Sequence, residues 1–203
     1  MSDRHDHLVG PDGELKRHAE VQRFDLHQRI QHGLMASSFT LLVLTGWPLT
    51  THGVGASHKL VEFFGGLAGT ALLHRIAAVA MIISAVYHAI WLVMKLAQGR
   101  LPFSMLPTLK DAKDVLHNFS YFLGLRKDRP RFPRYSYFEK FDYWAVFWGV
   151  TIMAGSGFIR WFPDVITSFT PAWVYEIALH AHADEGLLAA LAIFVWHFYN
   201  VHL

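Results

Sequence analysis

The chain has 203 residues, of which 53% are hydrophobic and 17% are charged, and its formal net charge is +2. It contains no cysteine, which excludes disulfides, thiolate zinc sites, cysteine-ligated iron–sulfur clusters and covalent haem attachment within the chain. This length indicates one domain or at most two, and so small a net charge does not indicate nucleic-acid binding.

The apolar residues gather in four long runs, Leu34–Thr50, Ala71–Leu96, Trp144–Phe162 and Ile177–Val201. Each run is near the ~20 residues that a helix needs to cross a bilayer core of about 30 Å. Backbone groups in lipid must pair within their own segment, so these runs predict helices. The expected fold is all-α: a polytopic membrane four-helix bundle over residues 32–203, preceded by a polar cytoplasmic segment, 1–31, with no cleaved signal peptide.

Lysines and arginines concentrate in the N-terminal segment and in the long link 97–138, whereas the link between the first two runs has only Lys59. The positive-inside rule therefore predicts that both termini and the long link face the cytoplasm of a bacterial inner membrane. Within that link, "LPTLKDAKDVLHNFSYFLGL" has apolar residues at helical spacing between Pro107 and Gly124, which suit a helix start and stop.

This stretch predicts an amphipathic helix that lies on the cytoplasmic membrane surface or packs on a soluble partner. The basic stretch that follows it, "RKDRPRFPRYSY", suits anionic lipid headgroups. Membrane lipid is therefore an expected partner of the link as well as of the four runs.

Fourteen histidines are present, and several of them lie inside the apolar runs, where ionisable groups are costly and usually functional. His74 and His88 share one face of the second run and are about 21 Å apart along its axis. His182 and His197 repeat this layout in the fourth run, about 22 Å apart. The second and fourth runs are parallel, so His74 reaches the depth of His182, and His88 reaches the depth of His197.

Imidazoles from two helices at each of two depths predict two stacked haems, each held by two axial histidines. The alternative is that these side chains form hydrogen bonds between helices. His32 opens the first run and also reaches the depth of His197. The spacing alone therefore leaves His32 and His88 as two possible partners of His197.

Three arginines lie where haem propionates could be bound. Arg75 follows directly after His74, Arg160 lies at the same depth at the end of the third run, and Arg29 lies near the cytoplasmic end of the first. A guanidinium can bind a carboxylate through two parallel hydrogen bonds, although each of these side chains could instead reach lipid phosphate. Glycines in the runs (Gly46, Gly149, Gly155 and Gly157) would allow haem or a neighbouring helix to approach closely.

Four stretches resemble the prokaryotic cytochrome b561-like family, which includes the membrane cytochrome b subunits of formate dehydrogenase, thiosulfate reductase and nickel–iron hydrogenase. They are "QRIQH…FTLLVLTGWPL", "LHRIAA", "YFEKFDYWAVFWGVTIMAGSGFIRWF" and "HADEGLLAALAIFVWHFYNVH", between Phe24 and His202. The resemblance implies two haem b groups, one between His74 and His182 and the other between His32 and His197. However, "LHRIAAVAMIISAVYH" also resembles the second helix of the quinol-oxidising cytochrome b of bc-type complexes, in which both histidines are ligands, which would make His88 a ligand.

The expected function is a dihaem subunit that passes electrons between a periplasmic redox partner and the quinone pool. The partner would be an iron–sulfur protein or a multihaem cytochrome c, and the quinone would be menaquinone or ubiquinone. Candidate quinone-site residues near the cytoplasmic haem are His32, His88, Gln28, Arg29, Glu139, Lys140 and Asp142. The alternatives are a haem-bearing anchor without a quinone site and a histidine-based metal or proton transporter. The transporter is disfavoured because the only carboxylates in the fourth run, Asp184 and Glu185, lie at its periplasmic edge.

Overall fold

The computed structural model describes residues 25–51, 55–100, 103–132 and 135–199. Most of the predicted N-terminal segment, the last residues of the fourth run and His202 lie outside these ranges. Within the described residues the chain forms helices and no strand, as the all-α prediction requires.

The first two long helices form an antiparallel hairpin. Helix α1 (Leu26–Thr50) and helix α3 (Gly66–Ala97) pack along their lengths, and the short α2 (Gly55–Phe63) joins them. Asp25 caps α1, because its carboxylate accepts a hydrogen bond from the backbone N–H of Gln28 at 2.8 Å and the Gln28 amide oxygen accepts one from the backbone N–H of Asp25 at 2.9 Å. The helix therefore starts within the segment 1–31 that the sequence analysis set apart as polar.

The second half of the chain forms another antiparallel hairpin. Helix α5 (Tyr137–Trp161) packs on α7 (Ala172–Leu191), and the short α6 (Pro163–Thr167) joins them. Helix α7 continues without a break into a π-helical segment, η3 (Ala192–His197). A π turn takes in more residues than an α turn, so this segment rotates His197 away from the position that a regular α-helix would give it.

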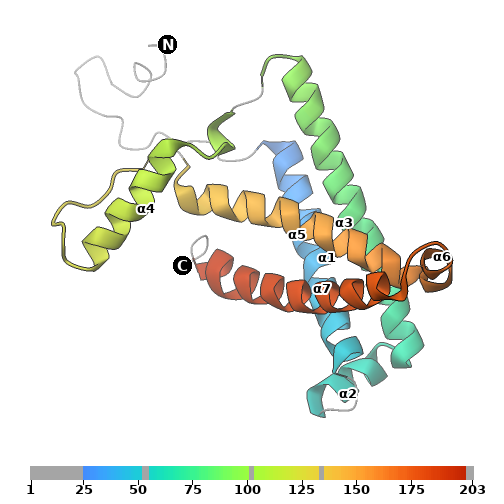
Figure 1. Ribbon diagram of the computed structural model, residues 1–203. Coiled ribbons are helices and arrows are strands. Elements are labelled where there is room, and N and C mark those ends of the chain that lie inside the picture. Colours follow the sequence, from blue (N-terminus) through green and yellow to red (C-terminus); the bar gives the residue numbers. More distant parts are fainter. Residues whose placement is uncertain (1–24, 52–54, 101–102, 133–134, 200–203) are drawn as a thin grey trace.

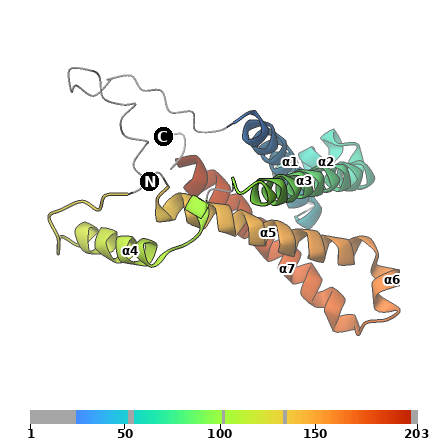
Figure 2. The same ribbon diagram turned by 90° about the horizontal axis from the view of Figure 1, so that it is seen from above.

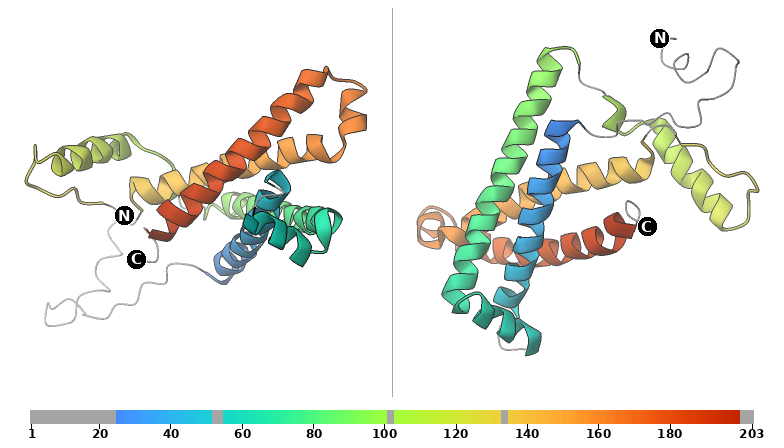
Figure 3. Two further views of the ribbon diagram at one scale, coloured as in Figure 1. Left: turned by 90° about the horizontal axis from the view of Figure 1, so that it is seen from below. Right: turned by 180° about the vertical axis from the view of Figure 1, so that it is seen from behind.

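The two hairpins form two layers that cross at a steep angle (Figures 1 and 2). The view from behind shows α1 and α3 lying across α5 and α7 (Figure 3). Contact between the layers comes chiefly from α1 against α7 and from α3 against α5. The side-by-side packing expected of a four-helix bundle is therefore present within each hairpin but not between the two hairpins.

In the part of the chain that the structure describes, three helices are long and apolar enough to cross a membrane: Leu26–Thr50, Gly66–Ala97 and the combined segment Ala172–His197. They contain the first, second and most of the fourth predicted run, so the chain is a multi-pass membrane protein. The third run lies in α5, which is not in this set. Its tyrosines, tryptophans and glycines, together with Arg160 at its end, make α5 less apolar than the other three helices.

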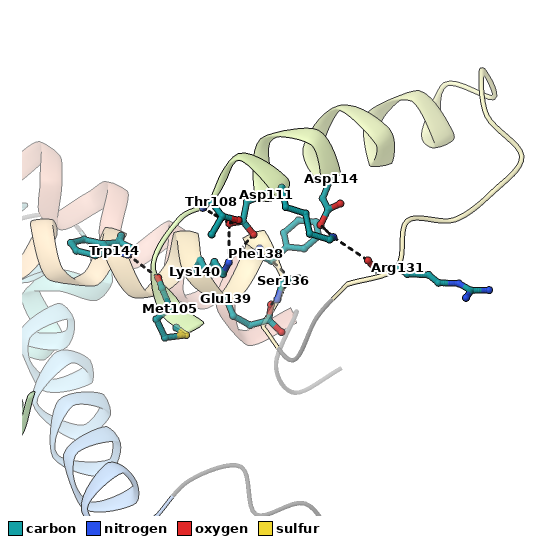
Figure 4. A network of polar contacts seen from close by, with 11 residues as sticks. Met105, Thr108, Asp111, Asp114, Arg131, Ser136, Phe138, Glu139, Lys140 and Trp144 are labelled. Atoms are coloured by element: carbon teal, nitrogen blue, oxygen red, sulfur yellow. Dashed lines mark hydrogen bonds and ion pairs between the residues drawn. The ribbon is translucent and has the colours of Figure 1, made fainter. Parts of the chain in front are cut away.

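The link between the hairpins contains a one-turn 3₁₀ helix, η2 (Phe103–Met105), and helix α4 (Leu109–Phe122), which lies where the sequence predicts a helix. The Lys140 ammonium at the start of α5 lies 2.9 and 2.8 Å from the two carboxylate oxygens of Asp111 (Figure 4). The Trp144 indole N–H donates to the backbone oxygen of Met105 at 3.1 Å. These contacts hold the link against the first two turns of α5.

Candidate functional site

His74 on α3 and His182 on α7 face one another across the two layers. Their ring centroids are 6.2 Å apart and their planes are inclined by 72°. His74 Nδ1 lies 2.9 Å from the hydroxyl of Thr45, and His182 Nδ1 lies 3.0 Å from the hydroxyl of Ser156. Each hydroxyl belongs to the other helix of the same hairpin. The Nδ1 atoms are thus engaged by the protein, which leaves the Nε2 atoms for a shared ligand.

Two glycines let these imidazoles lie against a neighbouring backbone. A Cβ atom added at Gly46 on α1 would lie 3.1 Å from His74 Cε1, and one added at Gly157 on α5 would lie 3.0 Å from His182 Cε1. Side chains at either position would push the rings out of place. The other two glycines that the sequence analysis named differ, because a Cβ at Gly149 would meet Glu185 Oε1 at 3.2 Å and one at Gly155 would meet nothing within 4 Å.

A second pair is formed by His32 on α1 and His197 at the end of η3. Their ring centroids are 6.3 Å apart and their planes are inclined by 33°. His197 Nδ1 lies 3.2 Å from a carboxylate oxygen of Asp142 on α5. The Nδ1 atom of His197 therefore contacts a carboxylate, whereas the Nδ1 atoms of His74 and His182 contact neutral hydroxyls.

His88 is not paired with His197. Its Nδ1 lies 2.9 Å from the Gln31 amide oxygen and its Nε2 lies 3.1 Å from the Tyr143 hydroxyl, so both ring nitrogens have protein partners. The ring also stacks on Trp91, with centroids 5.9 Å apart. Between the two partners that the sequence spacing allowed for His197, the structure brings His32 to it.

Two polar atoms beside His88 are buried and lack a hydrogen-bond partner: the amide nitrogen of Gln31, a residue that is 5% exposed, and the indole nitrogen of Trp91. A buried donor without an acceptor costs about 1–3 kcal/mol, so such atoms usually indicate an absent partner molecule. Together with His88 and Tyr143 they form a polar cluster, here called the His88 cluster, that lies between α1, α3 and α5.

The predicted arginines occupy different settings. Arg75 is exposed, and its guanidinium lies 5.3 Å from the ring centroid of Trp161. Arg160 is exposed and close enough to act electrostatically on both His74 and His182. Arg29 is exposed at the start of α1.

Three of the predicted quinone-site residues have local structural partners. Gln28 and Glu139 complete the capping boxes of α1 and α5. The third, Lys140, pairs with Asp111.

The ring-centroid separations of both histidine pairs match those of two imidazole ligands on one metal ion. An imidazole nitrogen binds such an ion at about 2.0 Å, so two imidazoles on opposite sides of it would have centroids roughly 6.3 Å apart. The observed separations, 6.2 and 6.3 Å, agree with this value. Within the described residues no group of three or more His, Cys, Asp or Glu side chains is arranged to hold a metal ion, so each pair supplies two ligands. A planar four-nitrogen macrocycle such as haem would supply the remaining ligands.

A model of the family described as prokaryotic cytochrome b561 matches residues 23–202. The chain belongs to this family. As a prokaryotic cytochrome b561 it is a membrane protein that binds haem b and transfers electrons, which confirms the family predicted from the four sequence stretches. Neither the curated proteins nor the solved structures contain a match to this chain.

The sequence analysis did not identify several residues around these pairs. Thr45 and Ser156 were missed, although a hydroxyl residue directly before a glycine in an apolar run is a recognisable signal. Gln31 was missed because it was assigned to the polar N-terminal segment. Tyr143 and Trp91 were missed because aromatic residues are common near the ends of membrane helices.

Proposed function

We propose that this cytochrome is the dihaem b-type subunit of a bacterial inner-membrane redox complex and passes electrons between a periplasmic partner and the quinone pool. The observation that carries the proposal is the presence of two facing imidazole pairs, both spaced for one iron. The polar contacts of Nδ1 in His74, His182 and His197 support it, because ligating histidines usually donate their other N–H to a neighbour.

In this proposal His74 and His182 hold one haem b and His32 and His197 hold the other, each through Nε2. Haem supplies one-electron chemistry, and two axial histidines keep small molecules off the iron. Thr45, Ser156 and Asp142 orient the rings. Arg75 and Arg160 bind propionates at the first site, and Arg29 does so at the second. The histidines at the two sites are about 22 Å apart along α7, enough to carry charge across most of a bilayer core.

The proposed topology places α1, α3, α5 and α7 across the membrane, with both termini and α4 on the cytoplasmic side. Helix α5 has 25 residues, or about 38 Å, which is enough to span. It packs along α7, so a membrane that contains α7 also contains α5. The positive-inside bias of the link 97–138 supports the orientation.

Menaquinone or ubiquinone would bind at the His88 cluster. Gln31 is adjacent in sequence to His32, so the cluster lies beside the proposed cytoplasmic haem. A quinone carbonyl accepts hydrogen bonds, and the unpaired nitrogens of Gln31 and Trp91 are donors for it. His88 and Tyr143 can supply protons during reduction. Of the other predicted quinone residues, Arg29 and Asp142 stay within this proposal, whereas Gln28, Glu139 and Lys140 have structural partners.

The electron donor or acceptor outside the membrane would be an iron–sulfur protein or a multihaem cytochrome c. The unpaired donors beside His88 favour this quinone-linked role over an anchor without a quinone site. The histidine-based transporter is less well supported, because the described residues contain no cluster of three ligands that would hold a bare ion.

Haem quantitation tests the proposal. A pyridine haemochrome assay on the purified chain is expected to give two b haems, and His32→Ala is expected to lose one of them. His88→Ala is expected to keep both haems and to lose the spectral shift that a quinone analogue produces. His180→Ala is a matched control on α7, since His180 is exposed and only two positions from His182. Loss of a haem in His88→Ala, with both retained in His32→Ala, would refute the assignment.

A further inference from the structure

Helix α4 turns its polar side toward the protein. Asp111 and Asp114 are each only 8% exposed. Asp111 pairs with Lys140 of α5, and the Asn118 amide donates to the Tyr137 hydroxyl at 2.8 Å. The contacts that hold α4 are therefore polar, which is the reverse of the usual packing of an amphipathic helix.

The apolar side of α4 faces outward. Leu109 is 85% exposed, Leu116 68%, Phe119 63% and Phe122 76%. Ala112, Val115 and Leu123 lie on the same side at helical spacing, so the exposed residues form one continuous apolar stripe along the helix. An exposed apolar stripe of this size indicates a surface that binds a membrane or another protein.

The position of α4 helps to decide between these two partners. The link that contains α4 joins the end of α3 to the start of α5, and α4 lies beside the start of α5 (Figure 1). The Asp111–Lys140 ion pair and the Trp144–Met105 hydrogen bond fix it to α5 (Figure 4). In the proposed topology the start of α5 faces the cytoplasm, so α4 would lie at the level of the lipid headgroups.

The charges around the stripe are unbalanced. Each acidic residue of α4 and the loop after it pairs with a cation or an imidazole: Asp111 with Lys140, Asp114 with Lys110 and Asp128 with His117. Lys113, Arg126 and Lys127 are exposed and form no ion pair within the described residues, and Arg129 lies over the ring of Tyr121. The free charge beside the apolar stripe is positive.

We propose that α4 is an in-plane membrane anchor, whose apolar stripe enters the headgroup–acyl boundary while the adjacent cations bind anionic lipid. An apolar face with a basic border is the pattern of helices that bind anionic membrane surfaces. A soluble partner subunit on the same stripe is the competing occupant, and the experiment below distinguishes the two. The proposal does not depend on the haem or quinone assignments.

Because the chain has no cysteine, one engineered cysteine can carry a nitroxide label at a chosen position. Phe119→Cys places the label on the stripe, and Lys110→Cys, exposed on the opposite side of α4, is the matched control. The holoprotein is reconstituted in phosphatidylcholine vesicles with and without phosphatidylglycerol. In the mixed vesicles the label at 119 is expected to collide more often with oxygen than with a water-soluble nickel chelate, and the label at 110 is expected to show the reverse.

Lipid charge is tested with the triple change Arg126→Gln, Lys127→Gln and Arg129→Gln. It is expected to reduce the oxygen preference at position 119 in mixed vesicles to the value seen in phosphatidylcholine alone. If the protein that keeps these three cations shows the same oxygen preference at position 119 in both kinds of vesicle, the proposed role of anionic lipid is wrong. If the nickel chelate collides freely with the label at position 119 in both lipids, α4 does not dock on the membrane. The same conclusion follows if the label is shielded from the chelate only when a partner subunit is added. Haem content, measured in parallel, shows whether the fold and the proposed haem sites are intact.

Discussion

Asp142 is expected to lower the reduction potential of the haem proposed at His32 and His197. A carboxylate that accepts the Nδ1–H of a ligating imidazole makes the ring a stronger donor and stabilises the oxidised iron. The other proposed site has only the neutral hydroxyls of Thr45 and Ser156 in this position. Asp142→Asn keeps a hydrogen-bond acceptor of similar shape and removes the charge.

The size of the effect follows from the strength of the two kinds of hydrogen bond. Bonds to charged groups contribute about 1.5–3 kcal/mol and neutral bonds about 0.5–1.5 kcal/mol. The observed distance of 3.2 Å is longer than the tightest charge-assisted bonds, so a difference of about 1 kcal/mol is appropriate. For a one-electron couple, in which tenfold corresponds to about 59 mV, Asp142→Asn should raise the potential by roughly 40 mV.

Potentiometric titration of the reduced b-haem absorbance measures this change. Only one of the two midpoint potentials should rise, with two haems still present by haemochrome assay. Asp164→Asn, an exposed carboxylate on α6, is the control and should move neither potential. A null result for Asp142→Asn, or a shift confined to the haem that His74→Ala removes, would show that Asp142 does not act on the ligand of the second site.

Three further results are expected. Gly157→Val should cost one haem, because even a Cβ would lie 3.0 Å from His182 Cε1, whereas Gly155→Val should keep both haems; equal loss in the two variants would contradict the packing argument. Lys140→Met should weaken the attachment of α4 by about 3 kcal/mol, seen as faster proteolysis of the link, and adding Asp111→Asn should recover part of the loss; no change in cleavage would show that the buried pair does not hold the link. Burial raises the pKa of Asp111, but hydrogen bonds from Lys140 and Thr108 outweigh it, so the net pKa lies below its ordinary value. The stabilisation that Asp111 gives to the attachment of α4 should therefore be complete above about pH 4 and be lost as the pH falls through the lowered pKa. The rate at which pepsin cleaves the link measures this loss.

Much of the fold was predictable because membrane helices are specified by length and apolarity. The runs around His74 and His182 identified α3 and α7, and Pro107 and Gly124 bounded α4 within two residues. The start of α1 was not predicted, since the Asp25 cap allows a polar segment to join the helix. The steep crossing of the hairpins was also not predictable, because it depends on interhelical contacts that periodicity does not encode.

The candidate site was predictable in its residue types but not in its pairing. Helical spacing placed His32 and His88 at the same depth and could not decide which of them meets His197. Two contacts account for the observed arrangement: Gln31 and Tyr143 engage both nitrogens of His88. Such side-chain partners come from different helices, α1 and α5, and their meeting depends on rotation about each helix axis, which a single sequence leaves open.

In the proposed arrangement three of the long helices supply the haem ligands, and the fourth supplies residues that tune them. Helix α7 with η3 supplies one histidine to each pair, and α3 and α1 supply the other two. Helix α5 supplies no histidine, but its Ser156 contacts His182 Nδ1 and its Asp142 contacts His197 Nδ1. Ser156 and Asp142 are fourteen positions apart, so they share one face of α5 and are about 21 Å apart along it, close to the spacing of the two histidines that they contact. Substitutions at these α5 positions should therefore shift the two potentials independently while both haems stay bound, whereas substitutions of the α7 and η3 histidines should remove a haem. If Ser156→Ala removed a haem as completely as His182→Ala, α5 would have to be counted as part of the ligand set.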